Sequence, residues 1–221
     1  AKQLVSQQGL AIDMPAGPSE LAVFADESAI PAFVAADLLS QAEHGVDSQV
    51  VLVSTNPQLI SVVVKEVEKQ LQDLPRKHIA EKALENSFAV LLKNTDEAVE
   101  FINNYAAEHL ILAVKDADEI ANQITNAGSV FIGNFTPESA GDYASGTNHT
   151  LPTNGYARAY SGVSVDSFVK KITFQKITAA GMKEIGPTIE TLANAEMLHA
   201  HKEAVSIRLR HIENSQNSEV N

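Results

Sequence analysis

Short β-rich runs alternate with longer helical segments along most of this chain, and that alternation limits the folds it can adopt. Five runs have the composition of strands: ELAVFA (20–25), QVVLVS (49–54), SFAVLL (87–92), HLILAV (109–114) and AGSVFIG (127–133). Strands that alternate with helices become parallel neighbours in one sheet, and the helices cover both of its faces. We therefore predict an α/β fold with a mainly parallel sheet.

The segments between these runs carry signals for helix starts and stops. Helices are predicted over residues 31–45, 56–74 and 95–109, with a shorter one near 116–124. Asn56 is expected to cap its helix, and Thr95 is expected to cap the next long one. Gly45 is a typical residue for a helix end.

The pattern changes beyond residue 163. VDSFVKKITFQKIT leads into AAGMKEIGPTIETLANAEMLHAHKEAVSIRLR, which has helical character. Proline removes a backbone donor and crowds the preceding turn, so Gly186-Pro187 is predicted to interrupt this helix. A mostly helical C-terminal extension should therefore follow the α/β part, and the last residues should fray.

Composition excludes several classes of function. The chain has 28 acidic and 16 basic residues, a net charge of -12, which argues against a nucleic-acid surface. It has neither an apolar run long enough to span a membrane nor the pattern of a signal peptide, so we expect a cytoplasmic location and no membrane partner. With no cysteine, a metal site must use His, Asp, Glu or Gln.

Residues whose side chains could take part in catalysis or ligand binding lie near the ends of the predicted helices and strands. In open α/β sheets, ligands usually bind beyond the carboxyl ends of the strands, and we expect the site there. SQAEHG ends a helix, YAAEHL joins a helix to a strand, and ESAGDYASGTNHTLPT (138–153) follows a strand. The last segment has few core-forming residues, so it is predicted to be a functional loop.

Gln41 and His44 are three residues apart, so they should project from one helical face. A carboxamide oxygen and an imidazole at this spacing could clamp one cation. The alternative is a solvated helix end, with His44 near the negative end of the helix dipole.

Glu108 and His109 are adjacent at a junction between a helix and a strand. A carboxylate and an imidazole can donate and accept protons near neutral pH. Neighbours in a strand point to opposite faces, so both can reach one site only if the backbone bends there. The alternative is an ordinary exposed pair.

The remaining candidates lie in the 138–153 loop and the C-terminal part. Asp142 and His149 could serve a ligand, or could simply bond their own backbone. EMLHAHKEA holds Glu196, His199 and His201. The two histidines are two apart and lie on different helical sides, so at most one should share a site with the others. The alternative for each is a surface histidine.

None of the common nucleotide, metalloprotease or nucleophile-elbow motifs is present, so these residues alone do not define a reaction. Five segments, however, resemble signature segments of the histidinol dehydrogenase family: PAGPSELAVFADESA, AADLLSQAEHG, AAEHL, AGSVFIGNFTPESAGDYASGTNHTLPT and HAHKEAVSIRL. They match in order and in approximate spacing over essentially the whole chain.

The resemblance implies both an architecture and an activity. The fold would be an aldehyde-dehydrogenase-like, incomplete Rossmann-type α/β arrangement. The protein would be a zinc- and NAD-dependent homodimer with one zinc per site and with the site shared between subunits. It would oxidise L-histidinol to L-histidine through L-histidinal with two NAD, in the last steps of histidine biosynthesis.

The resemblance also assigns roles to residues of this sequence. The implied metal ligands are Gln41, His44, Asp142 and, from the partner subunit, His201. The implied acid/base pair is Glu108 and His109. The implied substrate-binding residues are Ser19, Gln41, His44, His109, Asp142, His149, Glu196 and His201.

The family's chain is roughly twice as long, and its N-terminal half carries the NAD-contacting residues. Cofactor-binding residues are therefore expected in that absent half. Residues 1–19 would be a connecting segment from it, residues 20–163 the α/β catalytic and zinc-site domain, and residues 164–221 a mostly helical dimerisation tail.

Two other classes of function remain open. A non-catalytic zinc- or histidinol-binding module would bind substrate without forming NADH. A zinc-dependent hydrolase would use the same ligands with a zinc-bound water, and would turn over an amide or ester without any nicotinamide.

Overall fold

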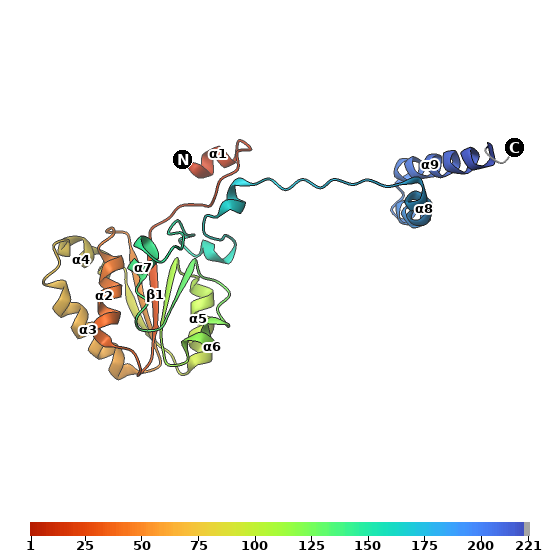
Figure 1. Ribbon diagram of the computed structural model, residues 1–221. Helices are drawn as coiled ribbons and strands as arrows, with labels where there is room; N and C mark the ends of the chain where they lie inside the picture. The colour runs from red at the N-terminus through yellow and green to blue at the C-terminus, as the bar shows by residue number, and fades with distance from the viewer. Residues whose placement is uncertain (219–221) are drawn as a thin grey trace. The chain divides into compact units, whose positions relative to one another are not determined.

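The computed structural model describes residues 1–218, which form two compact units that divide between Val169 and Lys170. The described part of the first unit contains a five-stranded sheet (Figure 1). Its strands lie in the order β3 (Phe88–Leu91), β2 (Gln49–Ser54), β1 (Glu20–Ala25), β4 (His109–Ala113) and β5 (Ser129–Ile132). Every neighbouring pair is parallel, which confirms the predicted α/β fold.

Helices cover both faces of the sheet, as the alternation predicted. On one face lie α2 (Pro31–Ala42), α3 (Pro57–Leu71) and α4 (Lys77–Glu85), and on the other lie α5 (Thr95–Tyr105) and α6 (Ala117–Ala121) (Figure 1). Strand side chains alternate between these faces. Leu21 and Ile111 pack in the cluster under α2, whereas Phe24 and Leu110 pack in the cluster under α5.

The structure confirms one of the two predicted helix caps and corrects the other. Asn56 caps α3, since its side chain accepts hydrogen bonds from the backbone of Gln58 and Leu59. The cap of α5 is Asn94 and not Thr95, because Asn94 has an extended backbone and its side chain accepts from the amide of Glu97 at 2.9 Å. Thr95 is instead the first helical residue.

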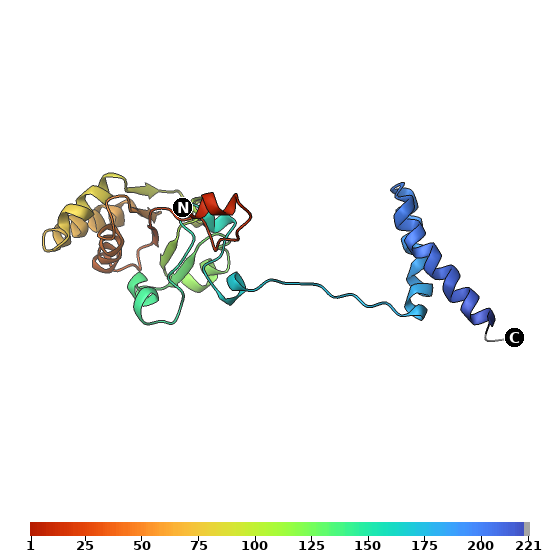
Figure 2. The same cartoon turned by 90° about the horizontal axis from the view of Figure 1, so that it is seen from above.

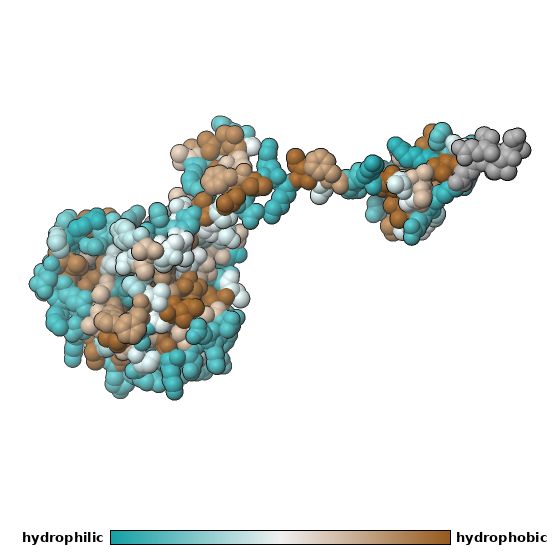
Figure 3. Space-filling model, in the orientation of Figure 1, coloured by the Kyte–Doolittle hydropathy of each residue, from teal (hydrophilic) through white to brown (hydrophobic). Residues whose placement is uncertain are grey.

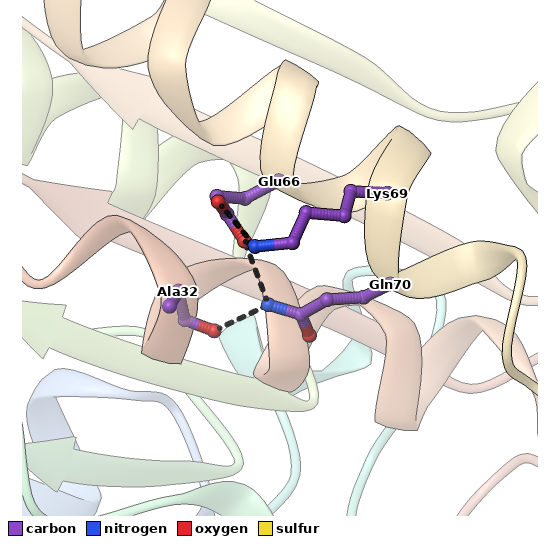
Figure 4. A network of polar contacts seen from close by, with 4 residues as sticks. All are labelled: Ala32, Glu66, Lys69 and Gln70. Atoms are coloured by element: carbon purple, nitrogen blue, oxygen red, sulfur yellow. Dashed lines mark hydrogen bonds and ion pairs between the residues drawn. The ribbon is translucent and has the colours of Figure 1, made fainter.

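A polar network fixes α3 against the first turn of α2 (Figure 4). The side-chain amide of Gln70 donates to the carbonyl of Ala32 at 3.0 Å. Glu66 accepts from the same amide at 3.5 Å and pairs with Lys69 at 3.1 Å. The start of α2 is thereby anchored to α3.

The chain after β5 returns across the molecule before it forms another helix. Gly133 has φ +86°, a left-handed conformation that glycine adopts without strain, and it allows the chain to turn back. The side chain of Asn134 then accepts from the amide of Ile30 at 3.2 Å and donates to the carbonyl of Ser28 at 3.1 Å. The following residues form α7 (Glu138–Tyr143).

The prediction of an irregular loop over residues 138–153 is therefore wrong for its first six residues. Gly141 explains how a helix with little apolar surface packs there. A Cβ atom at this position would lie 2.8 Å from the ring of Phe131, so only glycine lets α7 approach the sheet so closely.

The described part of the second unit is a helical hairpin, which Figure 2 shows as two helices side by side. Its helices are α8 (Ala179–Ala195) and α9 (His199–Ser218). The predicted interruption at Gly186-Pro187 is wrong, because α8 continues through Pro187. Gly186 lies against Leu209 of α9, where a Cβ would be 3.0 Å from that side chain, so this contact favours a continuous helix. The chain turns instead at Met197, which has φ +59°.

Shorter helical segments complete the described structure: α1 (Lys2–Ser6), η1 (Tyr156–Arg158) and η2 (Val165–Phe168). Among the described helices, none combines the length and the apolar character needed to cross a membrane.

Candidate functional site

The predicted site residues of the first unit gather at the amino edge of the sheet. Glu108 and His109 lie at the start of β4, and Ser19 immediately precedes β1. Gln41 and His44 lie at the end of α2, which returns to this edge. The expectation of a site beyond the carboxyl ends of the strands is therefore wrong. Helices that connect parallel strands run opposite to them, so helix ends and helix-to-strand junctions meet the amino ends of the strands.

His44, Glu138 and Asp142 form a cluster of potential metal ligands. One ligand atom from each of these side chains lies within 4.8 Å of the other two. His44 comes from the turn after α2, and the two carboxylates come from α7 at positions four residues apart, which share a helical face. The sequence analysis named His44 and Asp142 but missed Glu138. The four-residue spacing would have revealed it if the helix had been recognised.

Gln41 precedes His44 by three residues in the sequence, and it is fully buried on the last turn of α2. Among residues 1–218, neither its amide oxygen nor its amide nitrogen has a hydrogen-bond partner. A buried polar group without a partner costs about 1–3 kcal/mol, so such a group indicates an interaction with something outside the described residues. A carboxamide oxygen, an imidazole and a carboxylate are suitable ligands for zinc.

The backbone bends at Glu108, which allows this residue and His109 to reach the same place. Both side chains are buried, and Glu108 Oε2 lies 3.7 Å from His109 Nδ1. The same oxygen accepts from the backbone amide of Glu20 at 3.2 Å. The ring of His109 lies 6.0 Å from that of Phe131, measured between centroids.

Burial shifts the proton affinities of these groups in opposite directions. Loss of solvation raises the pKa of Glu108 to about 7 and lowers the pKa of His109 to about 4. Burial, with nearby Asp142 and Glu108, also raises the pKa of Glu138 to about 8. In this protein, His109 is therefore a neutral imidazole at neutral pH, the form that can accept a proton.

A pocket of about 250 Å³ joins three of the predicted residues, because Ser19, Glu108 and His149 all line it. His149 is exposed, Ser19 is half-buried and Glu108 is buried, so the pocket runs from the surface to Glu108. Its volume suits a small ligand.

Glu196 and His201 belong to the second unit. Glu196 directly follows α8, and His201 lies in the first turn of α9. Both are exposed, as is His199. Their participation in a site stays a prediction.

The metal cluster leads to a first prediction. We expect His44→Ala to lower the zinc affinity of the isolated chain by at least about 10–100-fold, since loss of even an outer partner of a metal ligand costs that much. Competition with a chromophoric chelator measures this. His78→Ala, which changes an exposed histidine on α4, is the matched control. Equal affinities in the two variants would contradict the assignment.

The chain is similar to known proteins over most of its length. The family profile described as Histidinol dehydrogenase matches residues 1–209. The histidinol dehydrogenase of Bacteroides fragilis (strain YCH46) is 66% identical over 212 residues, which is 96% of this chain and 50% of that protein. The chloroplastic histidinol dehydrogenase of Arabidopsis thaliana is 56% identical over 212 residues, with 96% and 46% covered.

A solved structure is also similar. The crystal structure of histidinol dehydrogenase from Elizabethkingia anophelis has a TM-score of 0.92 and 59% sequence identity, and the match covers 96% of this chain and 49% of that one. The chain therefore spans about half the length of the relatives that it matches.

Proposed function

This chain belongs to the histidinol dehydrogenase family, and on that premise we propose that it supplies the metal site and the proton-transfer residues of an enzyme that oxidises L-histidinol to L-histidine. The observation that carries the proposal is the buried Glu108–His109 pair beside the His44, Glu138 and Asp142 cluster at one edge of the sheet. Histidine biosynthesis is the pathway in which this reaction belongs.

Zinc would be held by Gln41, His44 and Asp142, with His201 of the partner subunit as the remaining protein ligand. The unpartnered amide of Gln41 and the mixed oxygen and nitrogen donors support this set. When bound, zinc supplies a positive centre that orients the amine and imidazole nitrogens of histidinol, and it takes no part in redox chemistry.

His109 would take the hydroxyl proton of histidinol in the first oxidation. Its neutral imidazole can accept that proton at neutral pH. NAD, when bound, supplies the acceptor for the hydride that leaves the carbinol carbon. The residues that bind NAD are proposed to lie in the half that this chain does not span.

Glu108 would serve the second oxidation. As water adds to the aldehyde carbon, its carboxylate takes the proton that the water loses. A pKa raised to about 7 makes Glu108 a stronger base than an ordinary glutamate while part of it stays ionised near neutral pH. Two proton acceptors in contact suit an oxidation in two stages. Ser19 and His149 would contact the substrate from the pocket that they share with Glu108.

We propose further that the protein works as a homodimer in the cytoplasm, with residues 164–221 as the dimerisation tail and residues 20–163 as the catalytic domain. Large apolar side chains of the second unit are exposed, among them Met197, Leu198 and Ile207, and these could be covered by another subunit. Val205 is not one of them, because it is already buried within the hairpin. The tail would bring Glu196 and His201 to the partner's site.

The first unit also has apolar residues at its surface, which Figure 3 shows in brown. Phe135, which precedes α7, and Tyr143, the last residue of α7, are both more than four-fifths exposed. We propose that another segment of the working enzyme covers these side chains. This supports a longer polypeptide, of the length of the relatives, as the working enzyme.

A chimera tests the proposal. It joins this chain to the half of the Bacteroides fragilis relative that the chain does not match, and we expect it to form NADH from L-histidinol when zinc and NAD are present. The same chimera with Asp142→Asn is the control and should lose most of this activity. A folded chimera that binds zinc and histidinol but forms no NADH would overturn the dehydrogenase proposal and favour the binding module. Turnover of an amide or ester without NAD would favour the hydrolase.

A further inference from the structure

Glu138 is a buried acidic residue for which neither the sequence motifs nor the proposed chemistry gives a role. It is the first residue of α7 and is only 1% exposed. Within the described part of the chain, its Oε2 atom has no hydrogen-bond partner. Burying such a carboxyl group costs free energy. We therefore expect an interaction in the working protein that offsets this cost.

The group that faces Glu138 is the imidazole of His109. Glu138 Oε1 lies 3.9 Å from His109 Nδ1, and Glu108 Oε2 lies 3.7 Å from the same nitrogen. Neither distance is a hydrogen bond, and neither ring nitrogen has a hydrogen bond of full geometry among the described residues, although the backbone of Glu20 also approaches the ring. Glu108 Oε2 already accepts from the backbone of Glu20, whereas Oε2 of Glu138, the oxygen other than the one nearest His109, has no partner among the described residues. A movement of about 1 Å would bring Glu138 within hydrogen-bond range of Nδ1.

We propose that Glu138 is a positioning residue, which accepts a hydrogen bond from Nδ1–H of His109 and so fixes the imidazole in the tautomer whose Nε2 is unprotonated. This inference rests on the proposed function, because the unprotonated Nε2 is then the atom that takes the hydroxyl proton. A carboxyl group keeps an acceptor oxygen whether or not it is ionised, so the pairing does not depend on the charge of Glu138. A partner on one ring nitrogen commonly sets the tautomer of a working histidine.

The alternative is that Glu138 binds the metal directly, since it belongs to the cluster with His44 and Asp142. The burial of the three groups favours positioning. His44 is exposed and Asp142 is half-buried, whereas Glu138 lies deeper, beside His109. An ion held by His44, Asp142 and Gln41 leaves Glu138 available for the imidazole.

The tautomer of His109 can be measured without any turnover. The isolated chain is labelled with ¹⁵N in its 7 histidines, and two-bond ¹H–¹⁵N correlations distinguish the Nδ1–H form from the Nε2–H form. The spectrum of His109→Asn identifies the signal by its loss. We expect the Nδ1–H form alone in the unmodified chain and in Glu138→Gln, whose amide oxygen still accepts. Glu138→Leu should give a mixture or the other tautomer, while the other six histidines serve as internal references.

A zinc titration separates positioning from direct ligation. We expect Glu138→Leu to bind zinc within about threefold of the unmodified chain, far from the loss expected for His44→Ala. If leucine prevents folding, Glu138→Met gives the same test with an unbranched side chain. A tautomer unchanged by either variant would overturn the proposal. Zinc binding lost to the same degree as in His44→Ala would also overturn it and make Glu138 a ligand.

The chimera keeps this inference distinct from the proposed function. In an active chimera, Glu138→Leu should lower kcat of the first oxidation about 10-fold or more with little change in KM, and Glu138→Gln should restore most of it. An inactive chimera with the expected tautomers would refute the dehydrogenase function and leave the Glu138–His109 pairing in place. An active chimera whose kcat is unaffected by Glu138→Leu would refute the positioning role alone.

Discussion

The isolated 221-residue chain should form NADH only at the background rate when it is mixed with L-histidinol, zinc and saturating NAD. It spans about half the length of its relatives, and the residues that would hold NAD are proposed to lie in the other half. Holding two reactants at attack distance can supply roughly 7–11 kcal/mol of a reaction barrier, and most of that contribution would be lost. The isolated chain should therefore be slower than the chimera by roughly 10⁵-fold or more.

The absorbance of NADH measures this directly, with the chimera as the positive control. The isolated chain should still bind zinc, because its ligands do not depend on the other half. Preserved zinc binding excludes misfolding as the reason for lost turnover. Robust turnover by a chain whose intact mass corresponds to residues 1–221 alone would contradict the prediction.

The second large effect should separate the two members of the acid/base pair. In the chimera, His109→Asn should slow the oxidation of histidinol to histidinal, because the acceptor of the hydroxyl proton is lost. Glu108→Gln should mainly slow the hydration and oxidation of histidinal. Loss of a positioned proton acceptor typically costs about 10²–10⁴-fold, and we expect each variant to lose that much in its own stage.

The two stages can be measured apart by supplying either histidinol or histidinal and following NADH in single-turnover experiments. His78→Asn, on the exposed surface of α4, is the control for the histidine substitution and should leave both stages unchanged. Equal rates in the variants and the parent chimera would remove the acid/base assignment. Equal losses in both stages for both variants would instead indicate that the pair acts as one unit.

The fold was largely predictable because its signals are local. The β-rich runs from ELAVFA to AGSVFIG became the five strands, and their separation by helices required parallel pairing. Asn56 was recognisable as a cap because it directly precedes proline at the first helical position. Thr95 was the wrong choice, since Asn94 stands one residue earlier and asparagine ranks above threonine as a helix cap.

Other features depend on tertiary contacts that a single sequence does not display. Gly141 lets α7 pack closely on Phe131, and α8 continues through Pro187 while Gly186 packs against Leu209 of α9. Glu138 was overlooked because the helix that places it four residues before Asp142, on the same face, was not recognised.

The location of the site was misjudged for a different reason. In many open α/β sheets, ligands bind at the carboxyl edge. The candidate residues, however, lie at helix ends, and these meet the amino edge of the sheet. SQAEHG and YAAEHL end helices, and helices of this topology end where strands begin. The closeness of His44 to Asp142 is consistent with the metal site implied by the family resemblance, while the roles of the individual residues remain predictions.

The segment between Asn134 and Glu138 restricts how this family of chains can vary. Surface connections usually accept insertions and deletions, because nothing depends on their length. Here Asn134 is bonded to Ser28 and Ile30 beyond the end of β1, while Glu138 and Asp142 must arrive at the opposite edge of the sheet. Removing one residue between them would shorten the connection by up to about 3.5 Å and draw both carboxylates away from His44, with every strand still paired. Length, rather than composition, is therefore the property that selection should preserve in this connection.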